Sequence, residues 1–418
     1  MVIRSYDPGG RVRMKKILIL TSTGGGGNYA VSNSLKEYLK TNYAVHELLP
    51  FQMILQSLRP ACFFKNLSGE EIYNFLLQKK WYRLANLWFN MGDYFFKIIS
   101  FYTKKFFKQY FLKEKPNLVI SVVPIINNEI FCVTKQLNIP FLLIPTDLDG
   151  RVFYSRLSHI NSHNNFKVAL PFDDNEIIDM AHQYGIENAH IEITGFPLKP
   201  SFLMDRNKDQ IRNHFNIPDD KQTLLLLMGK QGSHEMYRFA QQLGKIETPI
   251  HLICCIGKNE AVRPYVESIE LPEHISISII GFTEKIADLM AISDLIITKS
   301  GSVSFCETLY SSIPTILDAT STVLRWERFN HTFFKKHNLG GILTANSSIT
   351  EQIQTLLNDK KLMSTFRNNL LTLEKNKASC KIPELIKTML VPTTQTKENK
   401  CYQPKFKQLS IVQPVKQK

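Results

Sequence analysis

The chain alternates between short runs of apolar residues and longer stretches with helical periodicity. Short apolar runs are typical of buried parallel strands, whereas apolar residues repeated every three or four positions favour helices. The runs predict ten strands, at residues 17–20, 118–123, 141–144, 168–170, 191–193, 224–228, 250–256, 275–279, 295–298 and 315–317. Most of these strands are separated by a helical stretch, so the pattern predicts an α/β protein built from βαβ units.

The order of the units predicts two doubly wound domains with a hinge near Gly195. The expected divisions are an N-terminal extension (1–13), a first domain (14–193), a second domain (194–372), a C-terminal helix (373–390) and a tail (391–418). The tail carries six lysines and one acid with almost no apolar pattern, which predicts a flexible basic segment. Ligands of doubly wound sheets bind beyond the carboxyl ends of the strands.

Composition limits the class of protein further. With 44% hydrophobic and 21% charged residues among 418, the bulk of the chain is expected to fold, and no apolar run is long enough to cross a bilayer. The start lacks the long apolar core of a signal peptide, and the seven cysteines form no CxxC pair, so we expect a reducing cytoplasm and neither a disulfide framework nor a metal site. The net charge of +14 predicts an anionic partner, which could be nucleic acid, lipid headgroups or a phosphorylated substrate.

Four glycines at the end of the first predicted strand form a candidate binding loop. Gly24, Gly25, Gly26 and Gly27 are followed by a helical pattern. Glycines in this position let backbone amides approach a phosphate or an acceptor hydroxyl. The segment matches neither the dinucleotide fingerprint nor the P-loop, and a tight turn that merely packs is the alternative.

A second candidate loop follows the strand at 295–298. Ser300, Gly301 and Ser302 open a helix, so hydroxyls and free amides could hold an anion there. Glu307, about two turns later, could accept hydrogen bonds from a vicinal diol, or it could be an ordinary solvated glutamate. Glu327 and Asn330 are three residues apart and so share one helix face, which could meet sugar hydroxyls if it borders a cleft.

Residues 79–115 combine nine lysines or arginines with thirteen aromatic residues. Such a mixture suits a membrane interface, where rings lie at headgroup depth and cations meet anionic lipids. Stacking on nucleic-acid bases and aromatic helices that cover a sheet are the alternatives. The segment contains no known nucleic-acid-binding signature, so we expect no nucleic-acid partner. The residues predicted to contact the membrane are Trp81, Arg83, Trp88, Phe95, Phe96, Lys104 and Lys105.

Taken together, these segments resemble glycosyltransferase family 28, which includes lipid-directed members such as monogalactosyldiacylglycerol synthases and processive diacylglycerol glucosyltransferases. The resemblance runs in order through residues 194–200, 228–232, 257–259, 281–284 and 299–307, and through Glu327 with Asn330. It implies the GT-B arrangement, with two Rossmann-like domains facing a cleft. It also implies a UDP-sugar donor held by the second domain, with no metal and no other cofactor.

The resemblance also implies roles for individual residues. Phe282 and its neighbours would hold the uracil, Glu307 the ribose, and Ser300 to Ser302 the diphosphate, while Glu327 and Asn330 would face the hexose. The complete set of donor residues is Lys199, Gly229, Gly232, Gly281, Phe282, Thr283, Ser300, Gly301, Ser302, Glu307, Glu327 and Asn330. Trp326 stands where the family has a glutamine.

The candidate catalytic residues are Asp147 and Asn28. After the glycines the family usually carries a histidine that assists the acceptor, and Asn28 stands at that position here. An amide cannot take a proton at neutral pH, so Asp147, in the segment Pro145-Thr146-Asp147, is the best remaining carboxylate. A turn or helix cap is the alternative role for Asp147.

The resulting expectation is an inverting transferase that moves a hexose from a UDP-sugar to a membrane lipid, of diacylglycerol type. It would be cytoplasmic and peripherally bound to the inner face of an anionic membrane. The alternatives are a transferase with a protein or small-molecule acceptor, and a nucleotide-sugar-binding scaffold with impaired catalysis. The sequence does not predict the sugar or the oligomeric state.

Overall fold

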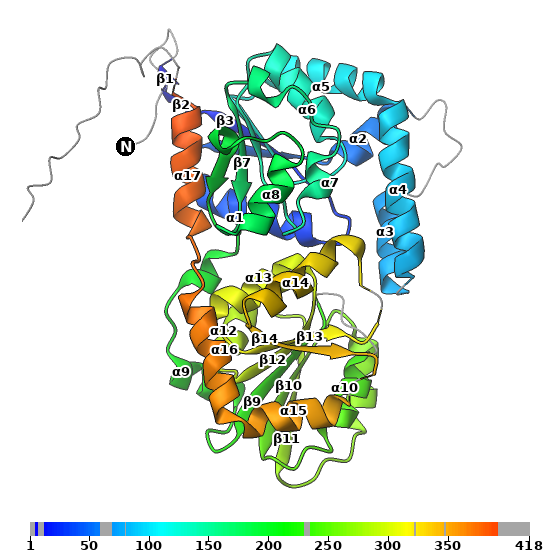
Figure 1. Cartoon of the computed structure of the whole chain (residues 1–418), viewed down its shortest axis with the longest axis vertical. Helices are drawn as coiled ribbons and strands as arrows, with labels where there is room; N and C mark the ends of the chain where they lie inside the picture. Colours follow the sequence, from blue (N-terminus) through cyan, green and yellow to red (C-terminus); the bar gives the residue numbers. More distant parts are fainter. Residues whose placement is uncertain are drawn as a thin grey trace, which may run out of the picture.

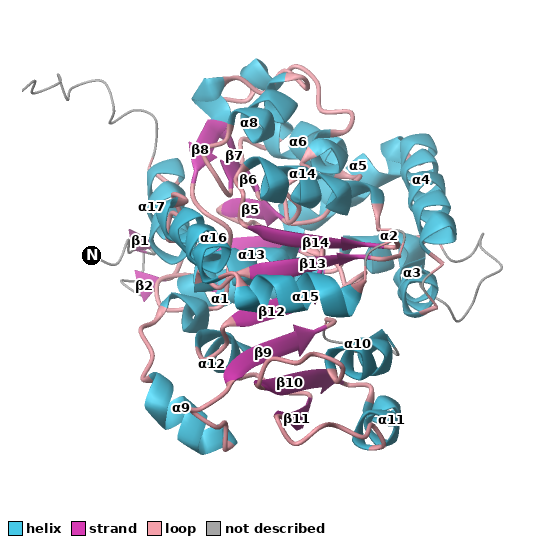
Figure 2. Cartoon of the chain, turned by 60° about the horizontal axis from the view of Figure 1, so that its bottom comes forward, coloured by secondary structure: helices cyan, strands magenta, loops and turns pink. Residues whose placement is uncertain are grey.

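A computed structural model describes residues 5–6, 12–58, 69–79, 81–229, 235–321, 323–346 and 348–391. Its two halves are stacked along the long axis of the molecule, and each contains one parallel sheet with helices on both faces (Figure 1, Figure 2). A small antiparallel ribbon, β1 (Ser5–Tyr6) with β2 (Val12–Arg13), precedes the first sheet. The predicted tail, apart from residue 391, and most of the predicted extension lie outside the described residues.

The first sheet has six parallel strands in the order β4-β3-β5-β6-β7-β8. The central strand β3 is completely buried from Ile17 to Leu20, which explains its uninterrupted apolar run. In chain order the strands are β3 (Lys16–Leu20), β4 (Ala44–Leu48), β5 (Leu118–Ser121), β6 (Phe141–Leu143), β7 (Phe166–Leu170) and β8 (Ile191–Ile193).

Helices join and cover these strands. They are α1 (Gly27–Leu39), α2 (Pro50–Ser57), α3 (Gly69–Gln78), α4 (Tyr82–Ile98), α5 (Ser100–Glu114), α6 (Asn127–Gln136), α7 (Arg151–Tyr154) and α8 (Asn175–His182), with short 3-10 turns η1 (Ile160–Ser162) and η2 (Asn188–His190). The chain between β4 and β5 carries four of these helices, and α3 and α4 lie at one side of the molecule, spanning the level where the two halves meet (Figure 1).

The second sheet is also six-stranded and parallel, in the order β11-β10-β9-β12-β13-β14. Its strands are β9 (Gln222–Leu227), β10 (Ile250–Gly257), β11 (Ile275–Gly281), β12 (Leu295–Lys299), β13 (Thr315–Ala319) and β14 (Gly340–Thr344). Its helical segments are η3 (Pro200–Leu203), α9 (Lys208–Phe215), α10 (Glu235–Leu243), η4 (Glu260–Val262), α11 (Arg263–Glu267), α12 (Ile286–Ala291), α13 (Ser302–Ser311), η5 (Arg325–Glu327), α14 (Arg328–Lys336), α15 (Ile349–Asn358) and α16 (Lys360–Thr372).

The ten predicted strands and the α/β class are confirmed, but β1, β2, β4 and β14 were not predicted. Of these four, β4 and β14 lie at the edges of the two six-stranded sheets. In β4 only Leu48 is buried and the strand includes His46 and Glu47, whereas β14 begins with two glycines. An edge strand has only one neighbour and lies partly in contact with solvent, so it does not need the continuous apolar run that identifies a central strand.

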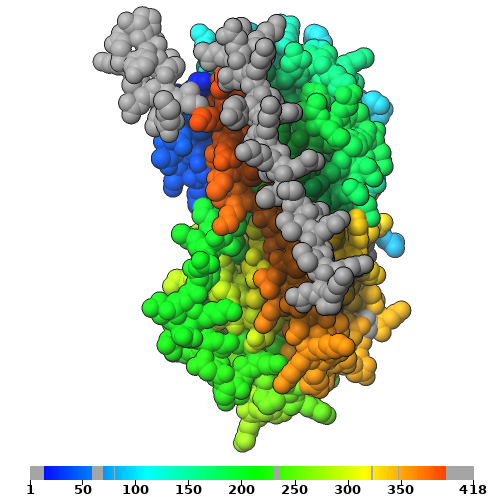
Figure 3. Space-filling view, turned by 60° about the vertical axis from the view of Figure 1, so that its left-hand side comes forward, coloured from blue at the N-terminus to red at the C-terminus, as the bar shows by residue number. Residues whose placement is uncertain are grey.

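The last helix, α17 (Ala378–Met389), returns to the first half of the molecule. Its residues Ile382 and Ile386 are completely buried in the same core as Val31 and Leu35 of α1. Figure 3 shows α16 on the lower half and α17 on the upper half, so the end of the described chain crosses between the two halves. The chain therefore connects the halves twice, once before α9 and once between α16 and α17.

The two crossing segments touch at Gly195. Its φ is +87°, and a Cβ atom at this position would lie 2.0 Å from the carbonyl oxygen of Asn376. The hydroxyl of Tyr310 accepts a hydrogen bond from the amide of Phe196 (3.0 Å) and donates one to the Asn376 carbonyl (2.9 Å). Only glycine satisfies both the left-handed backbone and the close contact.

We therefore expect Gly195→Ala to lower the free energy of unfolding by about 2–5 kcal/mol, from the left-handed strain together with overpacking. Gly185→Ala is the matched control, because Gly185 has a φ of +76° but no atom within 4 Å of the added methyl group. The control should lose only the strain component, about 1–2 kcal/mol. Urea denaturation of both variants measures the difference, and equal losses would contradict the packing argument.

Candidate active site

Two loops from different halves of the molecule face each other at the centre of the structure. The glycine loop, residues 24–27, joins β3 to α1, and the donor loop, residues 299–302, joins β12 to α13. A Cβ atom on Gly27 would lie 3.6 Å from Cγ2 of Val303, which is the second residue of α13. The tertiary structure thus brings the two predicted binding loops together across the boundary between the halves.

Side chains of α3 form hydrogen bonds with the glycine loop and with the two residues before it. The buried carboxylate of Glu70 accepts hydrogen bonds from the hydroxyl of Ser22 (2.6 Å) and from the amide (3.1 Å) and hydroxyl (3.0 Å) of Thr23. The side-chain oxygen of Asn74 accepts a hydrogen bond from the amide of Gly25 (2.8 Å). Glu70 and Asn74 were not predicted, because they lie more than forty residues from the loop they support.

This arrangement corrects one part of the prediction for the glycines. The amide of Gly24 donates to the hydroxyl of Ser22 (3.1 Å), and the amide of Gly25 is taken by Asn74. These two amides are therefore already used within the protein and are not available to a phosphate. Gly25 and Gly26 have φ values of +70° and +85°, so glycine is required here by the turn itself.

Asp147 lies between the two loops, at the end of the segment that follows β6. Its Oδ1 atom accepts a hydrogen bond from the hydroxyl of Ser302 in the donor loop (2.6 Å). The preceding residue, Thr146, donates its hydroxyl to the side-chain oxygen of Asn28 (2.6 Å). The two predicted catalytic residues are therefore linked through the dipeptide Thr146-Asp147. The side chain of Asn28 positions Thr146 and does not itself supply a base.

Burial raises the pKa of the Asp147 carboxyl to about 6, although the hydrogen bond from Ser302 opposes this effect; the nearby charge of Asp149 raises it further. A carboxyl with this pKa is mostly ionised at neutral pH and can still accept a proton during a reaction. The raised pKa therefore suits a general base, and the role of Asp147 in catalysis stays a prediction.

Two further carboxyls beside the donor loop have raised pKa values. Burial raises the pKa of Glu307 to about 8, with the Lys199 ammonium opposing, and raises that of Glu327 to about 7, with Asp147 adding to the effect. A Cβ atom on Gly301 would lie 3.6 Å from Oε1 of Glu327. Carboxyls with raised pKa values that gather at one loop are characteristic of functional sites.

The first turn of α14 supports the donor loop. Asn330 is fully buried, and its side-chain amide donates to the carbonyl of Ser300 (2.7 Å) and to the hydroxyl of Ser302 (3.2 Å). His331 forms a short hydrogen bond with the hydroxyl of Ser300. The amide nitrogen of Asn330 is therefore used within the protein, whereas its side-chain oxygen has no partner among the described residues, so the role of Asn330 toward a hexose stays a prediction. His331 was missed, since nothing in its local sequence indicates its contact with a residue 31 positions earlier.

The remaining predicted donor residues lie at the same edge of the second sheet. Gly229 follows β9 with a φ of +83°, and Gly281 ends β11, where an added Cβ atom would lie 2.5 Å from Oε1 of Glu260. Phe282 is 50% exposed, with the ammonium of Lys258 5.5 Å from its ring centroid. The hydroxyl of Thr283 accepts a hydrogen bond from the amide of Lys285 (3.1 Å). Gly232 lies outside the described residues.

Trp326, directly before Glu327, packs against the first half of the molecule. Its ring centroid lies 4.7 Å from that of Phe89 in α4, and it is buried together with Leu76, Ala85 and Leu324. The large apolar side chain at this position therefore joins α3 and α4 to the segment that holds Glu327. This contact explains why a tryptophan can replace the family's glutamine.

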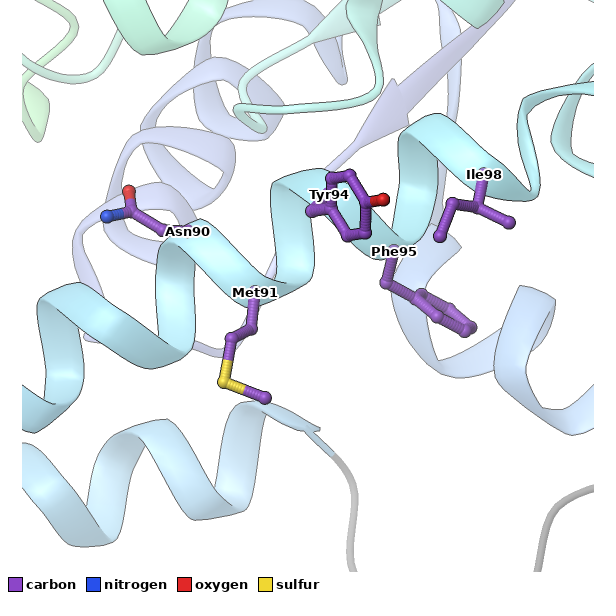
Figure 4. A pocket seen from close by; sticks show the side chains of 5 residues that line it. All are labelled: Asn90, Met91, Tyr94, Phe95 and Ile98. Carbon is purple, nitrogen blue, oxygen red and sulfur yellow. The ribbon is translucent and has the colours of Figure 1, made fainter.

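The outward face of α4 carries a row of exposed apolar side chains, which we call the α4 stripe: Leu84 (48% exposed), Leu87 (54%), Met91 (54%), Tyr94 (65%) and Ile98 (65%). The row continues into α5 with Phe101 and Tyr102. Figure 4 shows a shallow hollow on α4 lined by Asn90, Met91, Tyr94, Phe95 and Ile98. Exposed Lys97, Lys105 and Lys108 lie on the same two helices.

The structure corrects part of the predicted membrane surface. Phe96 is buried, with its ring centroid 5.2 Å from that of Phe51, and Trp88 is half-buried, with its ring nitrogen donating to the Gly69 carbonyl (3.0 Å). Neither residue belongs to the outward face. Trp81, Arg83 and Lys105 are exposed, whereas Phe95 and Lys104 are half-buried. The sequence could not distinguish the two faces of α4, because both carry large apolar residues.

No helix among the described residues is long and apolar enough to cross a bilayer. In the same part of the chain, no group of three histidine, cysteine or carboxylate side chains is placed to hold a metal ion.

Comparisons with known proteins agree with this architecture. The model of the glycosyltransferase family 28 C-terminal domain matches residues 223–389. A curated processive diacylglycerol beta-glucosyltransferase from Bacillus pumilus (strain SAFR-032) is 22% identical over 387 residues, which cover 88% of this chain and 94% of the relative. Acinetobacter baumannii MurG has a TM-score of 0.62 at 14% identity, covering 90% of this chain and 99% of its own. Arabidopsis thaliana UGT89C1, complexed with UDP-L-rhamnose, has a TM-score of 0.57 at 12% identity, covering 91% and 100%.

Two facing Rossmann-like sheets with the candidate site between them define a glycosyltransferase of the GT-B fold, and the protein is an enzyme of the hexosyltransferase class. More particularly, residues 223–389 match the C-terminal domain model of glycosyltransferase family 28.

Proposed function

We propose that the enzyme transfers a hexose from a UDP-sugar to a hydroxyl group of a membrane lipid of diacylglycerol type, with inversion at the anomeric carbon. The observation that carries the proposal is the convergence of Asp147, Glu307 and Glu327 on the donor loop, opposite the glycine loop. No metal is assigned a part in the reaction.

The donor side rests on the start of α13. Gly301 precedes the helix and carries no side chain that could cap it, so the first amides of the helix face the site. A diphosphate there would meet these amides, the helix dipole and the hydroxyl of Ser302. Glu307, two turns along the same helix, is placed to accept hydrogen bonds from the ribose, and Lys199 supplies a nearby cation.

The acceptor side rests on the first half of the molecule. The α4 stripe offers an apolar surface with lysines beside it, which suits a bilayer interface with anionic lipids. The relative from Bacillus pumilus is named for a diacylglycerol acceptor, which supports a lipid of this type. The α4 helix also contacts the donor side through Phe89 and Trp326, so the membrane surface and the site belong to connected parts of the molecule.

The chemistry is a direct displacement. The acceptor oxygen attacks the anomeric carbon on the face opposite the diphosphate, the new carbon–oxygen bond forms, and the bond to UDP breaks. Asp147 takes the proton of the acceptor hydroxyl, and UDP leaves with the bonding electron pair. The start of α13 stabilises the charge that develops on the leaving diphosphate.

The test of the whole proposal is transfer of radiolabel into an organic-extractable product. Purified protein is incubated with labelled UDP-glucose, UDP-galactose or UDP-N-acetylglucosamine and anionic liposomes that contain diacylglycerol. Label in the lipid phase identifies the sugar and the acceptor class. Absence of label with all three donors, while UDP still binds, would overturn the lipid acceptor.

Glu307→Ala tests the donor site by binding alone. We expect the variant to bind UDP more weakly by about 0.5–1.5 kcal/mol, the usual net value of a neutral hydrogen bond, because the raised pKa of Glu307 keeps its carboxyl largely neutral near pH 7. Isothermal titration calorimetry measures the change. Glu374→Ala, which alters an exposed glutamate after α16, is the control and should bind UDP as the unmodified protein does. An unchanged affinity in Glu307→Ala would contradict the donor assignment.

A further inference from the structure

Asp147 holds a position that the diphosphate of a bound donor would also need. The carboxylate lies on the donor loop, at the start of α13, where the diphosphate of a nucleotide sugar would bind. A carboxylate and a phosphate seek the same partners there, namely hydroxyl protons, backbone amides and the positive end of the helix dipole. One of these partners, the hydroxyl of Ser302, is bound by a carboxylate from the other half of the molecule.

The hydrogen bonds around Ser302 have a fixed direction. The side-chain amide of Asn330 donates to Oγ of Ser302 (3.2 Å), and the hydroxyl of Ser302 donates to Oδ1 of Asp147 (2.6 Å). Asn330 is fully buried and Ser302 nearly so. The serine has a single proton, so it cannot donate to Asp147 and to a phosphate oxygen at the same time.

The charges around this contact oppose the joint presence of Asp147 and a diphosphate. Asp149, which is paired with Arg151, and Glu327 both interact unfavourably with the charge of Asp147. A diphosphate would bring two more negative charges into the same partly buried space. Repulsion between like charges is stronger in a partly buried space than in bulk water.

We propose that Asp147 is a latch that fills the diphosphate position while the donor is absent and is displaced when the donor binds. The inference rests on the proposed function and deepens it. Thr146 stays hydrogen-bonded to Asn28, so only the side chain of Asp147 has to leave the donor loop. Displacement turns the candidate base away from Ser302 and toward the acceptor side, which makes the donor the first substrate to bind.

The test is the affinity for UDP-glucose, measured by isothermal titration calorimetry at pH 7.5. This ligand is suitable because its phosphate groups do not change charge near neutral pH. Asp147→Asn removes the competing charge but keeps an oxygen acceptor, and Asp147→Ala removes both. We expect Asp147→Asn to bind about ten- to a hundredfold more tightly than the unmodified protein, and Asp147→Ala at least as tightly as Asp147→Asn.

Asp179→Asn is the control for charge alone, because it removes a carboxylate whose side chain is 67% exposed on α8. Its affinity should equal that of the unmodified protein. Melting curves without ligand check that each variant is folded.

Different results would contradict the latch and the donor-site assignment. Unchanged or weaker binding in both Asp147 variants, with Glu307→Ala impaired as expected, overturns the latch and leaves the donor site standing. Absence of binding to UDP-glucose, UDP-galactose and UDP-N-acetylglucosamine by the unmodified protein and by both Asp147 variants overturns the donor site and the latch together. Binding of UDP-glucose by the Asp147 variants but not by the unmodified protein would support the latch.

Discussion

Asp147→Asn is expected to reduce kcat by about 10²–10⁴-fold, the usual contribution of a general base. An asparagine keeps the shape of the side chain but cannot accept the proton of the acceptor hydroxyl. The latch adds a second expectation, that the KM for the donor falls in the same variant, because the competing charge is gone. A lower kcat together with a lower KM separates this residue from one that merely supports the fold. Radiolabel transfer at several donor concentrations measures both constants.

The pH dependence provides a further check on Asp147. Its raised pKa of about 6 means that the carboxylate is charged at higher pH and neutral at lower pH. The kcat of the unmodified enzyme should therefore fall as the pH is lowered. The midpoint of this fall should lie somewhat above pH 6, because the negative charge of a bound diphosphate raises the pKa of Asp147 further. Asp147→Asn should lose this dependence, and Asp179→Asn should retain it. A residual activity in Asp147→Asn equal to that of Asp179→Asn would mean that another group acts as the base.

Met91→Glu combined with Tyr94→Glu is expected to weaken binding to anionic vesicles by at least about a hundredfold. The two side chains are 54% and 65% exposed at the centre of the α4 stripe. Each substitution removes apolar area, at roughly 25 cal/mol per Å² of contact, and adds a charge that anionic lipids repel by about 1 kcal/mol. Sedimentation with vesicles of phosphatidylcholine and phosphatidylglycerol at low salt measures the change.

The matched control uses exposed apolar residues of the other half of the molecule. Met204 is 67% exposed and Tyr265 is 56% exposed, so Met204→Glu with Tyr265→Glu makes the same chemical change away from the α4 stripe. This control should bind vesicles nearly as the unmodified protein does, apart from the small effect of net charge. Equal losses in the two double variants would show that charge alone governs binding and would contradict a specific role for α4. The UDP affinity of both double variants should be unchanged, which separates membrane binding from the donor site.

The tryptophans offer an independent signal for these experiments. The chain contains three, and they lie at Trp81 beside α4, at Trp88 within α4 and at Trp326 against α4. Trp81 is half exposed, whereas Trp326 is buried beside Glu327. Intrinsic fluorescence therefore reports on the proposed membrane surface and on the adjoining part of the donor site.

Motifs in the sequence were sufficient to find several residues of the candidate site. Asp147 and Ser302 were both predicted, because each follows a buried strand at the carboxyl edge of a parallel sheet, where ligands bind. Their hydrogen bond was not predictable, since the two residues are 155 positions apart and lie in different halves. Asn330 was placed on the correct helix, but its spacing from Glu327 could not show that its amide turns inward to the donor loop.

The sequence by itself determined the α/β class and the central strands, because a strand buried on both faces must be apolar along its whole length. It also determined where the binding loops begin, since these follow the strand ends. Tertiary structure decided which face of α4 is exposed, because both faces carry aromatic residues and only packing against Phe51 and Trp326 selects the inner one. It likewise decided that α17 packs against the first half and that Asp147 accepts a hydrogen bond from Ser302. Such contacts depend on how the two sheets are placed relative to each other, and no periodic pattern in the sequence indicates them.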